Sequence, residues 1–296
     1  KFLSRNKLYT FIEVFGLSVS LGFVILLASY AKTEFSVGAK QPLSKQLYVV
    51  GAGDSFGMTL GTSEEFFPSI PEIKAWTRIV DMDNSNVMVG DDYYKAAEAS
   101  IDTNFFKFFD YRLAGCPKEI VLENEDEAIL SESFAKKVFG NEDPIGRVLS
   151  IGDNKLTVIG VVEDFGPTDV FNHYDFFTSI KRAQKRCAWM DNFGSTIPIV
   201  RLDEGTDVEK VREELLKKYM GYWNFYKADN SDNAFLWGSS VTRLDKVYFS
   251  DMDAWSCLRT GNKKQVELLF IVALVLLISA IFNYINLTVA QTGKRA

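Results

Sequence analysis

The sequence is poor in the residues that most often carry catalysis and metal binding. Its 296 residues include a single histidine, His173, and three cysteines, Cys116, Cys187 and Cys257. No Cys-x-x-Cys pair occurs, so zinc chemistry of the usual four-ligand kind is not expected. An odd number of cysteines without short spacings is not a disulfide framework. One pair can still form outside the cytoplasm, and the sequence does not say which.

The sequence also lacks the signatures of nucleotide and nucleic-acid binding. It contains no Gly-x-x-x-x-Gly-Lys-Ser/Thr run, which excludes a P-loop for ATP. Gly51-Ala52-Gly53 follows a predicted strand, but the third glycine and the helix of a dinucleotide site are missing, so we expect a loop. The net charge is -6 and no basic stripe is present, which argues against nucleic acid as a partner.

No complete catalytic or metal-binding pattern is present. The run Asp81–Ser85 resembles the start of a calcium loop, but Asn86 replaces the required glycine, so we expect a turn between strands. The acidic run Glu123–Glu127 is interpreted as a solvated loop. His173 lacks an accompanying nucleophile in a strained turn and is interpreted as a structural or surface histidine. We therefore expect no catalytic, cofactor-binding or metal-binding residues and no cofactor.

Two long apolar stretches near the ends of the chain are the most informative feature that is present. A first transmembrane helix is predicted at residues 8–31, with Glu13 as its only charge, and a second at residues 266–290. At ~1.5 Å rise per residue, either stretch is long enough for a bilayer core of roughly 30 Å. The first is too long for the apolar region of a signal peptide, so we expect a retained span.

Basic residues near the spans predict the orientation of the chain. Lys1, Arg5 and Lys7 precede the first span, and Lys294 and Arg295 follow the second. Because positive charge favours the cytoplasmic side, both termini are expected in the cytoplasm and residues 32–264 outside it. Residues 1–7 are expected to form a cytoplasmic amphipathic segment, and residues 291–296 the start of a further C-terminal region.

Three polar residues within the predicted spans are candidates for a specific role. Glu13 is close to the membrane surface and is interpreted as interfacial, although a charge inside a span is by default a functional candidate. Asn283 and Asn286 are expected to hydrogen-bond to other helices, because an unpaired amide in lipid is costly.

Short strands and helices alternate between the spans. Strands are predicted at residues 46–50, 74–80, 86–89, 93–100, 148–151, 156–162, 197–202 and 242–249. Capping boxes at Thr62–Glu65 and Thr206–Glu209 predict helix starts, and Ser131 and Gly140 predict the ends of another helix. Residues 181–191 and 222–233 are expected to be surface loops. This mixture predicts an α+β architecture with an inserted hairpin unit.

Seven short runs also occur in a recognisable order along nearly the whole chain. They are Asn6–Ile12 with Gly16-Leu17, Ile70–Ile73 with Thr77-Arg78, Ile101–Phe106 with Phe109-Asp110, Leu130–Gly140, Asp143–Arg147, Val158–Val162 and Phe282–Leu287. Together they resemble the N-terminal part of the MacB-like, FtsX-related permease family of ABC transporters. The run Phe171-Asn172-His173 departs from the Asn-Ser-His of that family, so no role is assigned to His173.

The resemblance implies two transmembrane helices that flank a bilobed periplasmic domain. A split β-α-β porter-like lobe, at residues 45–117 and 195–250, would hold an inserted α/β hairpin lobe at residues 118–194. The implied function is that of a non-catalytic permease subunit in the bacterial inner membrane, which couples ATP hydrolysis by a separate cytoplasmic ATPase to movement of this domain. This mode is called mechanotransmission.

The resemblance also implies a set of partners. These are the cytoplasmic ABC ATPase, a second permease copy or the second half of the same permease, periplasmic or outer-membrane proteins, and membrane lipids. The same layout fits a two-span receptor with a periplasmic sensor domain. A membrane-tethered hydrolase is a third reading, and it would need a nucleophile and a base that we do not find.

Overall fold

The computed structural model describes residues 7–53, 55–114, 120–186, 196–226 and 239–292. The chain divides into two compact units. The helical unit contains the residues up to 36 and from 261 onward, and the core unit contains residues 37–260.

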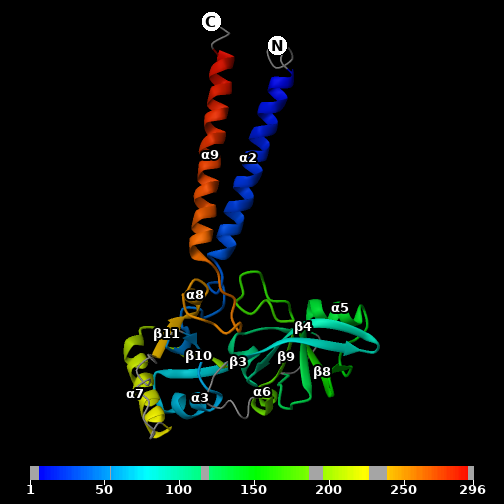
Figure 1. Cartoon of the computed structure of the whole chain (residues 1–296), viewed down its shortest axis with the longest axis vertical. Helices are drawn as coiled ribbons and strands as arrows, with labels where there is room; N and C mark the ends of the chain where they lie inside the picture. The colour runs from blue at the N-terminus through cyan, green and yellow to red at the C-terminus, as the bar shows by residue number, and fades with distance from the viewer. Residues whose placement is uncertain (1–6, 54, 115–119, 187–195, 227–238, 293–296) are drawn as a thin grey trace. The chain divides into compact units, whose positions relative to one another are not determined.

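The helical unit consists of two long helices that lie side by side, α2 (Lys7–Glu34) and α9 (Lys263–Thr292) (Figure 1). Within them, Val14–Glu34 and Lys263–Asn286 are long and apolar enough to cross a membrane. Only 6% and 11% of these two segments is buried, which distinguishes them from the core helices of a soluble protein. The predicted spans fall inside these longer helices.

The polar residues of the spans are only partly described. The side chain of Glu13 lies outside the described residues. Asn283 and Asn286 lie on α9, and no hydrogen bond joins their amides to another described side chain. Their pairing with other helices stays a prediction.

The described residues of the core unit form a sheet of eleven strands. Their order is β11-β1-β10-β3-β4-β9-β6-β8-β5, while β2 pairs with β1, and β7 pairs with β3 and β8. The pairs β4–β9 and β6–β8 are parallel and the other pairs are antiparallel. The bounds are β1 Leu47–Ala52, β2 Ser55–Phe56, β3 Ile73–Val89, β4 Asp92–Ile101, β5 Leu113–Ala114, β6 Glu127–Ser131, β7 Val148–Ile151, β8 Asn154–Val162, β9 Phe176–Ser179, β10 Thr196–Leu202 and β11 Ser239–Arg243.

Short helices cover parts of this sheet. They are α3 Leu60–Phe66, the 3-10 turn η1 Phe67–Ser69, α4 Phe105–Phe108, α5 Glu132–Phe139, α6 Ile180–Arg186, α7 Val208–Tyr226 and α8 Leu244–Val247. The apolar face of α7 buries Val211, Leu215 and Tyr219 in one core cluster with residues of β1, β10 and α3. Helix α5 buries Phe134 and Ala135 in a second cluster with β6 and β8.

One sheet runs through both predicted lobes. Strand β9 belongs to the predicted insert, yet it pairs in parallel with β4. Strand β3 has 17 residues and reaches ~56 Å at ~3.3 Å per residue. The hairpin of β3 and β4 therefore forms the long axis of the sheet (Figure 1). The division of the core into two lobes stays a prediction.

The structure confirms one predicted set of helix ends and corrects two. Ser131 caps α5, since its hydroxyl accepts the Phe134 N–H at 3.3 Å, and Gly140 ends this helix at φ 63°. The two predicted capping boxes are wrong. Helix α3 already begins at Leu60, and Thr62 instead donates to Thr59 O at 2.9 Å. At α7 it is Asp207 that accepts the amide of Glu209, at 3.1 Å.

Five local predictions are also wrong. One is the loop predicted at residues 222–233, because residues 222–226 continue helix α7. The strand predicted at 242–249 ends at Arg243, where α8 begins, because Leu244 and Val247 are buried one helical turn apart. Residues 181–186 form α6 rather than a loop, and Gly51 and Ala52 belong to β1 rather than to a loop. The calcium-like run does not separate two strands. It forms a bulge inside β3, because the register with β4 shifts between the pairs Asp81–Ala99 and Asn84–Ala97. Asp83, within the bulge, has φ 63°.

Candidate functional site

The two linkers that leave the core unit toward α2 and α9 bind the same internal loop. These linkers, residues 37–46 and 248–260, and the loop, residues 163–175, are named here the linker clamp. Gly38 N–H donates to Thr168 O at 2.9 Å. Arg259 donates from its side-chain Nη1 to Pro167 O at 2.8 Å and from its backbone to Val170 O at 3.0 Å. Both linkers are thus held within four consecutive loop residues.

A buried polar group fixes the first linker. Gln41 donates from Nε2 to Phe109 O at 2.9 Å, and its Oε1 lies 3.5 Å from the Tyr111 hydroxyl. The same hydroxyl donates to Asp169 Oδ2 at 2.8 Å. Burial raises the pKa of Asp169, and burial together with the Asp169 charge raises the pKa of Tyr111. Loop and linker therefore share a desolvated hydrogen-bonded network.

A second polar group fixes the second linker. His173 Nε2 lies 3.1 Å from Ser256 O, and the Tyr174 hydroxyl donates to Cys257 O at 3.3 Å. The Asp81 N–H donates to Cys257 Sγ at 3.2 Å, which ties the linker to the bulge of β3. Cys257 is buried, and burial raises the pKa of its thiol, which is the setting of a structural cysteine. Cys116 and Cys187 lie outside the described residues, so the disulfide question stays open.

An aromatic cluster lies beneath the clamp. Phe105, Phe109 and Phe171 are all buried, and their ring centroids are separated by 4.9 to 5.2 Å. Val37 of the first linker and Leu258 of the second belong to the same core cluster. Such ring pairs add stability beyond their buried area, so the clamp has a rigid base.

Both linkers contain residues in the left-handed backbone region. Leu43 has φ 58°, and the consecutive residues Trp255 and Ser256 have φ 48° and 62°. Gly38 has φ 74°, and a Cβ there would lie 2.8 Å from Leu244 O, so this position needs glycine. Each such non-glycine residue costs on the order of 1 kcal/mol, which the surrounding contacts must offset.

Arg78, on strand β3, is a buried arginine outside the linker clamp. Arg78 is 4% exposed and makes a bidentate pair with Asp102, with Nε and Nη2 at 3.0 and 2.8 Å from the carboxylate oxygens. Its Nη1 donates to Leu60 O at 2.6 Å, and Nη2 also reaches Glu64 Oε1 at 2.8 Å. Every guanidinium nitrogen has a partner, which indicates a structural role.

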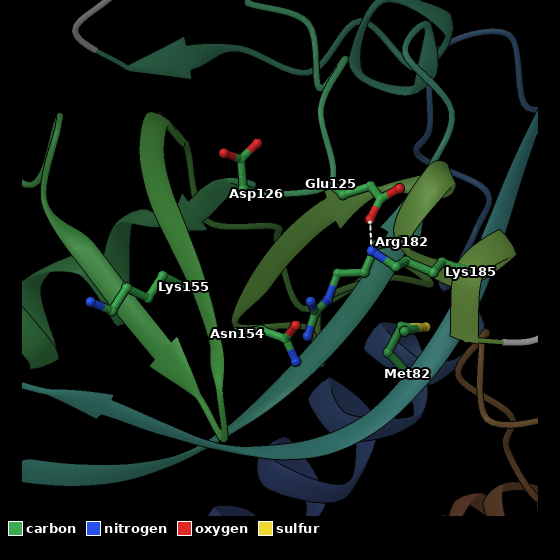
Figure 2. A pocket seen from close by; sticks show the side chains of 7 residues that line it. All are labelled: Met82, Glu125, Asp126, Asn154, Lys155, Arg182 and Lys185. Carbon is green, nitrogen blue, oxygen red and sulfur yellow. Dashed lines mark hydrogen bonds and ion pairs between the residues drawn. The ribbon is translucent and has the colours of Figure 1, made fainter.

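A polar pocket of about 380 Å³ lies on the same sheet (Figure 2). It forms where the bulge of β3, the start of β6, the start of β8 and helix α6 meet. Its lining residues are Met82, Glu125, Asp126, Asn154, Lys155, Arg182 and Lys185.

Arg182 is the least exposed charge of the pocket. Its Nε donates to Glu98 Oε1 at 2.9 Å, and Glu98 is only 1% exposed. Thr178 and Ser85 donate to the same carboxylate at 3.0 and 2.9 Å, which fixes its position. Among the residues that the structure describes, the terminal nitrogens of Arg182 have no hydrogen-bond partner. In Figure 2 the guanidinium projects into the pocket on the side of Asn154.

The other charges of the pocket balance. Lys185 Nζ pairs with Glu125 Oε2 at 3.0 Å. Lys155 and Asp126 have no ion-pair partner within the described part of the chain. Three cations therefore face two lining carboxylates and the buried Glu98. Within the described ranges, no group of three or more His, Cys, Asp or Glu side chains is arranged to hold a metal.

Sequence reasoning did not find this pocket. The sequence predicts a turn at Asp81–Ser85, a solvated loop at Glu123–Glu127 and a surface loop at residues 181–191. The structure brings all three together. The pair of Glu98 and Arg182 spans 84 residues, so no local spacing could have signalled it.

The family described as the MacB-like periplasmic core domain matches residues 10–218. This is more than half of the chain. The chain belongs to this family. It is a MacB-like periplasmic domain of the ABC transporter permease family, with a candidate membrane helix on either side of it in sequence. No curated protein matches the sequence.

Two solved structures with TM-scores above 0.5 share the fold of the MacB-like domain, and a third is also similar. A domain of a protein from Porphyromonas gingivalis, described as a permease, is 20% identical with a TM-score of 0.53, over 78% of this chain and 99% of that chain. The periplasmic region of MacB from Actinobacillus actinomycetemcomitans is 13% identical with a TM-score of 0.51, over 69% and 91%. The extracellular domain of the ABC-type transporter YknZ from Gram-positive bacteria is 12% identical with a TM-score of 0.49, over 66% and 99%.

Proposed function

We propose that this chain is the non-catalytic moving part of an ABC transporter permease in the bacterial inner membrane. A separate cytoplasmic ATPase hydrolyses ATP, and the two membrane helices carry the resulting motion into the periplasmic core unit. A second permease copy, or the second half of the same permease, completes the transporter. The family match and the two apolar helices support this proposal.

The observation that carries the proposal is the linker clamp. Motion of either membrane helix enters the core unit through a linker, and both linkers are hydrogen-bonded to residues 167–170. The linkers also contain Leu43, Trp255 and Ser256 in the left-handed backbone region. A linker held in this way transmits displacement instead of absorbing it, as a flexible linker would.

The first test is whether an ATPase is a partner. The full-length permease is purified from its native membrane, and its nucleotide-binding partner is identified. We expect an ABC ATPase to co-purify. Normal function in the absence of any such subunit would refute coupling and would favour the two-span receptor.

The second test concerns the clamp. Arg259→Gln removes the side-chain bond to Pro167 O, and Arg212→Gln is the matched control on the outer face of α7. In the reconstituted complex we expect ATP to change hydrogen exchange of core-unit amides in the wild type and the control. Arg259→Gln should keep ATP hydrolysis and lose most of that change. An unaltered exchange response in this variant would refute the role of the clamp.

A further inference from the structure

We propose that the polar pocket binds the carboxylate group of a small ligand, between an amino acid and a short peptide in size. This inference goes beyond the coupling function and does not rest on it. It follows from the charge, hydrogen bonding and size of the pocket formed by α6, β3, β6 and β8.

Arg182 supplies the recognition group. Its Nε is bound to Glu98, and Thr178 and Ser85 hold that carboxylate in turn. The guanidinium is thereby fixed before any ligand arrives, while Nη1 and Nη2 retain their donors among the described residues. A planar pair of donors in fixed orientation matches the two oxygens of a carboxylate. Pre-organisation of this kind lowers the entropic cost of binding.

The pocket has the dimensions and lining of a small-molecule site. Its volume of about 380 Å³ lies within the ~300–1,000 Å³ that is usual for ligand pockets. Asn154 adds an amide that can both donate and accept, and it lies beside the guanidinium in Figure 2. Met82 adds one apolar wall, and Lys155 adds a second cation.

The charge balance favours a carboxylate over a phosphate. Glu125 and Asp126 also line the pocket, and Glu98 lies directly behind Arg182. These carboxylates repel a dianion more than a monoanion. Asp126 has no ion-pair partner in the described chain, so it is available to an amino group on the same ligand. A ligand that carries both charges would leave the pocket neutral.

The experiment measures binding to the complete chain in detergent micelles by titration calorimetry. Three probes are compared: tri-alanine with a free carboxylate, the same peptide with a C-terminal amide, and inorganic phosphate. We expect saturable binding of tri-alanine. The amide should bind at least about tenfold more weakly, because the bidentate ion pair with Arg182 is lost. Phosphate should also bind more weakly than tri-alanine.

Two variants assign the binding to this pocket. Arg182→Gln combined with Glu98→Gln removes both charges and keeps hydrogen-bonding groups, which protects the fold. We expect this double variant to weaken tri-alanine binding at least about tenfold. Asn154→Ala, at an exposed strand end, should weaken binding about threefold to tenfold. Arg212→Gln on α7 is the matched control and should leave the affinity unchanged.

Three outcomes would overturn the proposal. The first is the absence of saturable tri-alanine binding to the wild-type chain. The second is equal affinity for the acid and the amide, or equal affinity of the wild type and the double variant. The third is tighter binding of phosphate than of tri-alanine, which would assign a phosphate site instead. None of these outcomes depends on an ATPase, so they are distinct from failure of the coupling proposal.

Discussion

Two arginines of the core unit differ in how completely they are hydrogen-bonded, and the difference separates a structural role from a recognition role. Arg78 and Arg182 are both largely buried, at 4% and 15% exposed. Arg78 binds Asp102, Glu64 and a backbone carbonyl, so no donor is left. Arg182 binds Glu98 through Nε alone. Burial by itself therefore does not identify a site, whereas a fixed guanidinium with donors still available does.

The largest loss of stability is expected when Arg78, the arginine with a structural role, loses its partner. Asp102→Ala removes the bidentate partner of Arg78 and leaves a buried cation with only Glu64 as counter-ion. We expect the free energy of unfolding to fall by about 3 kcal/mol, measured by denaturant unfolding of the full chain followed by tryptophan fluorescence. Glu209→Ala, which removes an exposed pair on α7, is the control and should cost less than about 0.5 kcal/mol. An equal loss in both variants would contradict the structural role of Arg78.

A smaller loss of stability is expected when Arg182, the arginine of the pocket, is replaced. Arg182→Gln leaves Glu98 without a cation, but Thr178 and Ser85 still donate to it. We expect a loss of about 2 kcal/mol in the same unfolding assay. Adding Glu98→Gln should recover at least half of this loss, since the uncompensated buried charge is then removed. If the double variant loses the sum of both single losses, the two side chains do not act as a pair.

The loss of a neutral hydrogen bond should destabilise the fold less than the loss of either charged pair. Ser131→Ala removes the hydroxyl that caps α5 and accepts the Phe134 N–H. We expect a loss of about 1 kcal/mol, again from unfolding of the full chain. Ser133→Ala, inside the same helix and exposed, should change stability by less than about 0.5 kcal/mol. A loss at Ser131 as large as that at Asp102 would remove the distinction between charged and neutral buried bonds.

The smallest expected effect is a pH dependence in the linker clamp. Burial lowers the pKa of His173, so the folded chain holds this proton less firmly than the unfolded chain does. The stability from this group is therefore present above the unfolded pKa of about 6.5 and declines as the pH falls below it. We expect a decline of only a few tenths of a kcal/mol between pH 7 and 5.5, because the side chain is solvent-exposed in part.

His173→Gln measures this contribution. The difference in unfolding free energy between the wild type and this variant should move in favour of the variant as the pH falls from 7 to 5.5. A difference that stays constant over that range, or moves in the opposite direction, would show that His173 does not titrate as its burial implies.

Features with a local chemical cause could be predicted from the sequence. Ser131 and Gly140 mark the ends of α5, and Gly152, with φ 57°, allows the turn between β7 and β8. The apolar face of α7 follows from Val211, Leu215 and Tyr219 at helical spacing. The two candidate membrane helices follow from composition alone. In each case the residues that determine the element lie inside or beside it.

Features that depend on distant residues could not be predicted. Strand β9 is four residues long and buried on both faces, so it shows no alternation, and its pairing with β4 joins Phe176 to Glu98. The segment from Thr242 to Phe249 has an apolar pattern that fits a strand or a helix, and only its packing selects α8. The bonds of the second linker to the internal loop join residues 83 to 92 positions apart, and the Glu98–Arg182 pair of the pocket joins residues 84 positions apart. No periodic pattern in the sequence indicates such contacts.

The linker clamp bears on whether the core unit can be moved from one protein to another. Gly38 and Arg259 are bonded to the adjacent residues Thr168 and Pro167, so the chain enters and leaves the core unit at neighbouring points. A folded segment with neighbouring ends behaves as a cassette, since its removal or replacement need not stretch the chain that carries it. Residues 37–260 are therefore a natural unit for transplantation, and helices from another permease can receive them as a single insertion between two existing spans.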